Sequence, residues 1–243
     1  MTPIVVTDPE RAPIELVDEL AGFGVATVHE ALGRTGLLGT DLRPLQGGAR
    51  IGGTAVTVLC WPGDNLMFHV AVEQCRPGDL LVVTTTSPST DGMFGELLAT
   101  SLRSRGVRGL VTTTGVRDVA DLRQLGFPVW SAAVSAQGTV KATAGAVNVP
   151  VVLGGQLVRP GDAILADDDG VLCVPRVDVR RGIAAARARI EKEAAARAAF
   201  GAGELGLDRY GLRATLTALG VRYMTAAEYD RDHSPGLADS GDT

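Results

Sequence analysis

The amino-acid sequence predicts an α/β fold followed by a helical extension at the C-terminal end. In the first half, short segments rich in β-branched residues alternate with helical patterns, which is typical of parallel strands joined by crossover helices. In the second half, strand patterns follow one another with only tight turns between them, which favours an antiparallel layer. The 243 residues suffice for one well-filled core with a helical appendage.

These patterns give the expected elements in chain order. A helix is expected over residues 14–23, and Thr27 and Glu30 have the spacing of a capping box that would begin a second one. The expected parallel strands are 54–60, 80–86, 109–114 and 128–130, separated by helices at 65–74, 94–105 and 119–125. The expected antiparallel strands are 138–144, 149–153, 163–166 and 171–174, and two further helices are expected over 177–200 and about 208–219.

The domain organisation follows from this order. We expect an α/β domain with N-terminal helices over residues 1–176 and a C-terminal helical extension over residues 177–229. The extension is rich in Ala and its apolar stripe is narrow, so it is better suited to packing on a neighbouring subunit than to forming a core. Residues 230–243 are polar and rich in turn formers, and we expect them to form a flexible tail.

The composition argues against several classes of protein. A formal net charge of −5 gives no electrostatic footprint for a nucleic-acid backbone. The sequence has no apolar run near the roughly 20 residues that a membrane span needs and no signal-peptide pattern at its start, so a cytoplasmic protein is expected. The three cysteines are scattered and lack metal-site spacing, which indicates neither a disulfide framework nor a zinc site.

The candidate site residues lie around Arg117 and Asp118, which closely follow the expected strand 109–114. In an open parallel sheet, ligands bind beyond the carboxyl ends of the strands. The helix that begins near Phe94 follows the loop 87–92, and the unpaired N–H groups of a helix start are suited to a carboxylate. An anionic, oxygen-rich ligand would thus bind to these N–H groups, to the Arg117 guanidinium and to a divalent cation held by Asp118.

Each of these features also has an ordinary structural explanation. An Arg-Asp dipeptide is often a solvated or paired surface feature, and Glu96 near a helix start stabilises the helix dipole. The spacing favours a shared site, because the twenty residues between Glu96 and Arg117 are enough for one helix and one strand. The start of that helix would then lie beside the end of that strand.

Over about residues 24–223, the sequence resembles the RraA-like family, and within it the class II 4-hydroxy-4-methyl-2-oxoglutarate and 4-carboxy-4-hydroxy-2-oxoadipate aldolases. The family signature is an acidic residue, twenty residues and then Arg-Asp, which corresponds here to Glu96, Arg117 and Asp118. Other segments that resemble these aldolases include VATVHEALGRTG, PGDNLMFHVAVEQCRPGD, FGELLATS, GVRDV, RPGDAILADDDGVLCVP and GELGLDRYGLR. The resemblance implies an α/β fold of the three-layer swivelling β/β/α type.

The resemblance implies a metal-dependent retro-aldol enzyme that releases pyruvate, as in the catabolism of aromatic compounds, with oxaloacetate decarboxylation as a side activity. Asp118 would be the single direct protein ligand of Mg²⁺ or Mn²⁺, and waters and substrate oxygens would complete its shell. Arg117 would bind the keto oxygen and stabilise the enolate. The pyruvoyl carboxylate would bind the backbone N–H groups of Gly95, Glu96, Leu97 and Leu98.

The resemblance also implies a homo-oligomer, a trimer or a hexamer, in which a glutamate of a neighbouring subunit completes the site. Counting back from GELGLD assigns this role to Glu193, with Glu191 as the second candidate. A solvated charge on the helix surface is the alternative interpretation of Glu193.

Two positions depart from the aldolase pattern. Glu96 stands where the family usually has Asp, so its side chain is one methylene longer. If this residue positions a water for proton transfer, the geometry must adjust to the longer side chain, while the charge is kept. Thr113 stands where the strand before Arg-Asp commonly carries an Asp, and a lost carboxylate would change substrate preference or metal affinity.

One alternative function and one alternative mechanism compete with this prediction. Some members of the family are regulators that bind a ribonuclease or an RNA helicase without catalysis, but they are shorter, so the C-terminal helices favour the aldolase. An aldolase without a metal would need a lysine that forms a Schiff base. The chain contains only Lys141 and Lys192, both expected at solvated or paired positions, which favours the metal-dependent route.

Overall fold

The computed structural model describes residues 2–233 and divides the chain into two compact units. The first unit ends at Glu191 and the second begins at Lys192, so the division falls within the long helix α6 (Val179–Gly201). None of the helices in the described residues is long and apolar enough to cross a membrane.

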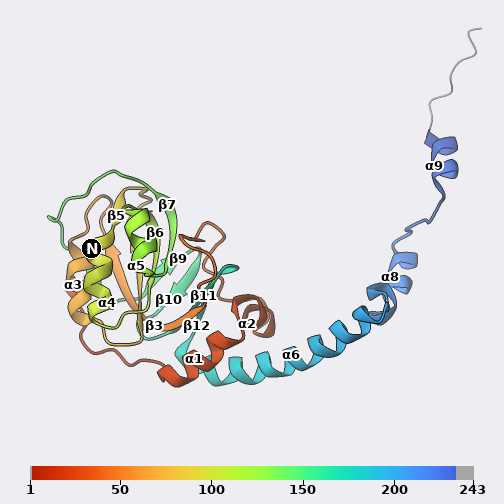
Figure 1. Ribbon diagram of the computed structural model, residues 1–243, viewed down its shortest axis with the longest axis horizontal. Coiled ribbons are helices and arrows are strands. Elements are labelled where there is room, and N and C mark those ends of the chain that lie inside the picture. Colours follow the sequence, from red (N-terminus) through yellow and green to blue (C-terminus); the bar gives the residue numbers. More distant parts are fainter. Residues whose placement is uncertain (1, 234–243) are drawn as a thin grey trace, which may run out of the picture. The chain divides into compact units, whose positions relative to one another are not determined.

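A parallel sheet forms the centre of the first unit (Figure 1). In spatial order, its strands are β3 (Ile51–Cys60), β4 (Asp79–Thr85), β6 (Leu110–Val116) and β7 (Val129–Val134). The helices between them along the chain are α3 (Leu66–Gln74), α4 (Glu96–Ser104) and α5 (Val119–Leu125). The predicted alternation of parallel strands and crossover helices is confirmed. Residues 80–83 of β4 are fully buried, which explains their unbroken apolar run.

Further strands extend this sheet. The strands β1 (Ile4–Val5) and β8 (Ala146–Val147) lie beyond β3, and β2 (Arg43–Pro44) pairs with β7. The hairpin of β11 (Ala163–Asp167) and β12 (Gly170–Val174) pairs antiparallel with β3, whereas β5 (Gly92–Phe94) pairs with the end of β6. A separate hairpin contains β9 (Val151–Leu153) and β10 (Gln156–Val158). The antiparallel pairing expected in the second half is therefore present.

Three apolar clusters hold these layers together. On one face of the sheet, α3, α4 and α5 cover the strands (Figure 1), with Phe68, Phe94 and Leu102 buried in the first cluster. Trp130 belongs to a second cluster with residues of β9 to β12. In the third, α1 (Ile14–Gly22), α2 (Val25–Ala31) and the start of α6 pack with β11 and β12. The result is a mixed α/β domain with helices and further strands on either side of the main sheet.

The capping box expected at Thr27 and Glu30 is wrong, because α2 begins two residues before Thr27. The residue before the helix, Gly24, has a φ of +85°, which favours glycine. The Val25 N–H donates a hydrogen bond to Oδ2 of the buried Asp167, 2.9 Å away. A carboxylate from a distant part of the chain therefore replaces the local cap.

The strand expected over residues 138–144 does not form. It contains only one isolated bridge, between Val140 and Asp64. The N–H groups of Ala142 and Thr143 donate hydrogen bonds to the Asp64 carboxylate instead of to a neighbouring strand. The Asp64 carboxylate and the backbone bonds of Val140 therefore hold the segment that carries Lys141.

In the described residues, the second unit consists of the end of α6 and three short helices, α7 (Gly206–Arg209), α8 (Leu212–Ala218) and α9 (Ala226–His233). The single helix expected over residues 208–219 is interrupted at Gly211, whose φ of +64° is left-handed. Of the expected tail, residues 230–233 belong to α9, and residues 234–243 lie outside the described residues.

Candidate functional site

Arg117 and Asp118 directly follow β6, at the carboxyl end of a central strand. The Arg117 N–H donates a hydrogen bond to the Phe94 carbonyl, 2.8 Å away, which ties this strand end to the start of α4. Asp118 has a left-handed backbone, with a φ of 55°, at a cost of about 1 kcal/mol for a residue with a side chain. It precedes α5, yet its side chain makes no cap bond there. The carboxylate instead lies against α4.

Gly95 provides the space for this contact. A Cβ atom at this position would lie 2.2 Å from Asp118 Oδ2 and 3.2 Å from Arg117 Cγ. The φ of −155° is ordinary extended backbone, so glycine is needed here for space and not for conformation. The N–H of Glu96, the first residue of α4, donates a hydrogen bond to Asp118 Oδ2 at 3.2 Å.

The Arg117 guanidinium lies beside the same carboxylate. Arg117 Nε is 3.7 Å from Asp118 Oδ2, and the two side chains are 44% and 39% exposed. An ion pair this open to water contributes little to stability. Both side chains therefore keep polar atoms that can contact a ligand.

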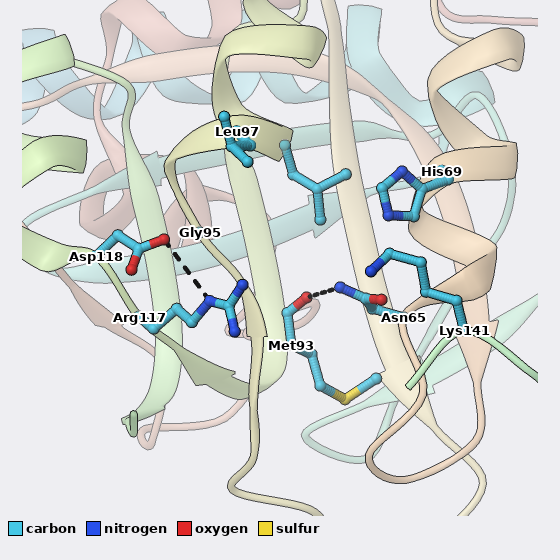
Figure 2. A pocket seen from close by; sticks show the side chains of 9 residues that line it. Asn65, His69, Met93, Gly95, Leu97, Arg117, Asp118 and Lys141 are labelled. Carbon is cyan, nitrogen blue, oxygen red and sulfur yellow. Dashed lines mark hydrogen bonds and ion pairs between the residues drawn. The ribbon is translucent and has the colours of Figure 1, made fainter. Parts of the chain in front are cut away.

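These groups face a cavity of about 90 Å³ (Figure 2). Its lining residues are Asn65, His69, Met93, Gly95, Leu97, Leu98, Arg117, Asp118 and Lys141. Five of the residues expected in the site thus lie together around one cavity: Gly95, Leu97, Leu98, Arg117 and Asp118. The N–H groups of Leu97 and Leu98 lie in the first turn of α4, where a helix offers no carbonyl partner.

The Glu96 side chain does not point to the Asp118 carboxylate that its backbone N–H contacts. Its Oε1 accepts a hydrogen bond from Thr100 Oγ1 at 2.6 Å, along its own helix. It lines a separate hollow with Arg103, Asp121, Gln124 and Leu125. The structure therefore places the Glu96 N–H at the Asp118 carboxylate and its carboxylate elsewhere.

The remaining expected residues lie outside the lining of this cavity. Glu193 lies on the part of α6 that belongs to the second unit, and Glu191 is the last residue of the first unit. Thr113 Oγ1 donates a hydrogen bond to Thr84 Oγ1 at 3.1 Å, between two neighbouring strands of the sheet. The position at which the family resemblance implies an Asp is thus occupied here by a hydroxyl paired with another hydroxyl.

The wall opposite Arg117 and Asp118 was missed by the sequence analysis (Figure 2). It consists of Asn65, His69 and Lys141. Asn65 follows the carboxyl end of β3, so the rule that located Arg117 also applies to it. Lys141 was not expected here, because its segment was predicted to be a strand in which the lysine is solvated or paired with a carboxylate.

The charge of the cavity suits an anion. Desolvation by the surrounding protein lowers the pKa of His69, and the nearby Lys141 ammonium lowers it further. Because the ordinary pKa of histidine is about 6.5, the His69 ring is neutral at pH 7. Among the lining side chains, Arg117 and Lys141 are cationic and Asp118 is anionic, which leaves one net positive charge.

Asp64 holds the Lys141 segment against the start of α3. Burial raises the pKa of Asp64, but hydrogen bonds from the N–H groups of Leu66, Ala142 and Thr143 outweigh this effect, and the net shift is downward. Its Oδ1 accepts from the Leu66 N–H at 2.9 Å, and its Oδ2 accepts from Ala142 at 2.9 Å and Thr143 at 2.6 Å. With 2% of its surface exposed, Asp64 fixes both sides of this wall.

Asp64→Ala is therefore expected to reduce the free energy of unfolding at pH 7 by about 3 kcal/mol, because three N–H groups lose a charged acceptor. The pKa of Asp64 is lowered in the folded state, so its contribution is present above the unfolded-state pKa and is lost as the pH falls. Chemical denaturation should show the difference from the native sequence shrinking below about pH 4. The same difference at every pH would contradict this account, and Asp41→Ala, at an exposed aspartate, is the control.

Comparisons with known proteins agree with this architecture. The family described as "RraA-like: Aldolase/RraA" matches residues 25–173. A relative from Halalkalibacterium halodurans is 28% identical over 166 residues, which cover 68% of this chain and 79% of the relative. A second, from Burkholderia multivorans, is 36% identical over 142 residues, or 58% of this chain and 86% of the relative. Both are provisionally named 4-hydroxy-4-methyl-2-oxoglutarate aldolase.

A solved structure shares the fold. Streptomyces coelicolor RraAS2 superposes with a TM-score of 0.71 at 30% sequence identity, covering 78% of this chain and 99% of that protein. It is described as an unusual member of the RNase ES inhibitor RraA protein family. Because the family match spans more than half of the sequence and includes α4, Arg117 and Asp118, this chain belongs to the RraA-like family.

Proposed function

We propose that this protein is a divalent-metal-dependent aldolase that cleaves a 4-hydroxy-2-oxo diacid and releases pyruvate. The observation that carries the proposal is that the Arg117 guanidinium, the Asp118 carboxylate and the start of α4 face one cavity. The names of the two sequence relatives support the same reaction. Candidate substrates are 4-hydroxy-4-methyl-2-oxoglutarate and 4-carboxy-4-hydroxy-2-oxoadipate.

The reaction breaks the bond between carbons 3 and 4. The electron pair of this bond moves into the pyruvoyl unit and places negative charge on the keto oxygen, while a base takes the proton of the 4-hydroxyl and carbon 4 becomes a carbonyl. A proton then adds to carbon 3 of the enolate and gives pyruvate. The N–H groups of Leu97 and Leu98 would bind the pyruvoyl carboxylate at the positive end of α4. Arg117 would donate hydrogen bonds to the keto oxygen, where charge develops in the transition state.

The donor set fits a cation that keeps most of its water. No group of three or more His, Cys, Asp or Glu residues able to hold a metal occurs in residues 2–233, and Asp118 is the one carboxylate among the lining residues of this cavity. Mg²⁺ retains several waters and is often held by one or two carboxylates, and Mn²⁺ accepts similar oxygen ligands. Asp118 would hold such an ion, which when bound polarises the keto oxygen as a Lewis acid.

Other parts of the proposal extend beyond this cavity. Oxaloacetate decarboxylation is proposed as a side activity, because it also leaves negative charge on a pyruvoyl unit. Glu193, or else Glu191, is proposed to complete the site of a neighbouring subunit in a trimer or hexamer. Glu96 is proposed to assist proton transfer, and its carboxylate would first have to leave Thr100.

The test is pyruvate release by purified protein. After treatment with EDTA and addition of Mg²⁺, 4-hydroxy-4-methyl-2-oxoglutarate should yield pyruvate, followed as NADH oxidation by lactate dehydrogenase. Parallel reactions with 4-carboxy-4-hydroxy-2-oxoadipate, oxaloacetate and Mn²⁺ cover the related substrates and metal. Absence of pyruvate in all of them would refute the aldolase.

A regulatory function is the second candidate, favoured by the similarity to RraAS2. A protein of this type would bind a ribonuclease and change its rate without releasing pyruvate. Adding the purified chain to RNase ES and following RNA cleavage tests this function. Inhibition of cleavage together with no pyruvate release would establish the regulator in place of the aldolase.

A further inference from the structure

The Asn65 side chain has an acceptor that no protein group satisfies in the described structure. Asn65 is only 6% exposed, and it lines the cavity. Its Nδ2 donates a hydrogen bond to the Met93 carbonyl, 3.0 Å away, while Oδ1 is buried without a hydrogen-bond partner. An unsatisfied buried acceptor costs about 1–3 kcal/mol, so such groups usually mark a missing ligand or water.

The bond to Met93 also fixes which way the amide faces. Only nitrogen can donate to a carbonyl, so Nδ2 is held at Met93 and Oδ1 is directed away from it. A ligand that satisfies this oxygen must present a donor. The substrate carboxylates and the keto oxygen have none, whereas the 4-hydroxyl has one.

The backbone around Asn65 is held in place. The Asn65 N–H donates to the Val140 carbonyl at 3.0 Å, and the Val140 N–H donates to the Gly63 carbonyl at 2.9 Å. The Asp64 carboxylate joins the same two segments. The position of the amide is therefore set before any ligand binds, which suits a group that selects among ligands.

The position of Asn65 matches the part of the substrate that the reaction removes. Figure 2 shows Asn65 across the cavity from Arg117 and Asp118. If the pyruvoyl unit lies at Arg117 and the start of α4, as in the proposed function, carbon 4 extends toward the opposite wall. We infer that Asn65 determines specificity: its Oδ1 accepts a hydrogen bond from the 4-hydroxyl of the substrate and favours hydroxy-oxo acids over oxo acids without that group.

This inference rests on the proposed function but makes a separate prediction. An amide oxygen is not a base at neutral pH, so Asn65 only orients the 4-hydroxyl of the substrate. Another group accepts the proton of that hydroxyl. Oxaloacetate reaches the same enolate without a 4-hydroxyl. The ratio of kcat/KM for 4-hydroxy-4-methyl-2-oxoglutarate to kcat/KM for oxaloacetate should therefore fall about tenfold in Asn65→Ala, the effect of one lost hydrogen bond.

Two variants and one control make this measurement decisive. Asn65→Ser, whose hydroxyl is too short to replace the amide oxygen, should lower the ratio in the same way and serves if Asn65→Ala does not fold. Gln46→Ala is the control, because Gln46 also donates through Nε2 to a carbonyl and has a buried Oε1 without a partner, but it does not line the cavity, so its loss should leave the ratio unchanged. An unchanged ratio in both Asn65 variants would overturn the inference while leaving the aldolase intact.

A binding measurement covers the case in which no turnover is seen. Calorimetry should show that the native protein binds 4-hydroxy-2-oxoglutarate about tenfold more tightly than 2-oxoglutarate and that Asn65→Ala removes this preference. Equal binding of the two acids by the native protein, or binding of neither, would overturn the inference. Discrimination without pyruvate release would support Asn65 and refute the proposed reaction.

Discussion

Arg117→Ala is expected to lower kcat for pyruvate release about a hundredfold, because loss of one charged donor to a developing oxyanion typically costs about 3 kcal/mol. The guanidinium is 44% exposed and makes only a loose contact with Asp118, so its removal should have little effect on folding. Steady-state kinetics and thermal unfolding of the same preparation separate the two effects. The expected result is a large loss of turnover with a nearly unchanged Tm.

The control for this variant is a second arginine, on α4 but outside the cavity. Arg103 lies at the end of α4 and donates to the Leu125 carbonyl, outside the cavity of Arg117. Arg103→Ala should retain activity within a factor of about three. Arg117→Lys keeps the charge but loses the planar pair of donors, and we expect an intermediate rate. A loss of less than about tenfold in Arg117→Ala would remove Arg117 from the transition state.

Gly95→Ala is expected to reduce turnover by about a hundredfold, because the added methyl group displaces the Asp118 carboxylate or the start of α4 without changing any charge. The added methyl group would lie 2.2 Å from Asp118 Oδ2, so the carboxylate or the start of α4 must move. A displacement near 1 Å at a catalytic group is enough for a loss of this size. The Mg²⁺ concentration needed for half-maximal activity should rise together with the loss in kcat.

Gly22→Ala provides the matched control for Gly95→Ala. Gly22 is the last residue of α1, its backbone is not left-handed, and a Cβ there meets no atom within 4 Å. This variant should keep full activity and equal or slightly higher stability, because alanine favours the helix. Full activity of Gly95→Ala would show that the contact between α4 and Asp118 is dispensable.

Much of the fold could be predicted because its signals are local. The apolar run at residues 80–83 and the β-branched run before Arg117 identify buried parallel strands, and the helical patterns between them identify the crossovers. The elements that were missed depend on distant partners. The Asp167 carboxylate, and not Thr27, caps α2, and the Asp64 carboxylate accepts the N–H groups of residues 142 and 143 where a neighbouring strand was expected.

The same distinction applies to the site. Arg117, Asp118 and the start of α4 could be located because strand ends and helix starts follow from the pattern. The direction of the Glu96 side chain could not, because it depends on the Thr100 hydroxyl one turn later. Lys141 was missed because residues 138–144 were expected to form a strand. Asn65 could have been located by the same rule as Arg117, because it follows β3 as Arg117 follows β6.

The measurement that most directly tests the central claim is the Mg²⁺ dependence of pyruvate release by the native protein and by Asp118→Asn. Asparagine keeps the size of the side chain but removes the charge that would hold the cation. The native protein should be inactive in EDTA and saturate with Mg²⁺, and Asp118→Asn should need at least about tenfold more Mg²⁺. Full activity in EDTA, or the same Mg²⁺ saturation for both proteins, would contradict a cation held at Asp118 beside Arg117.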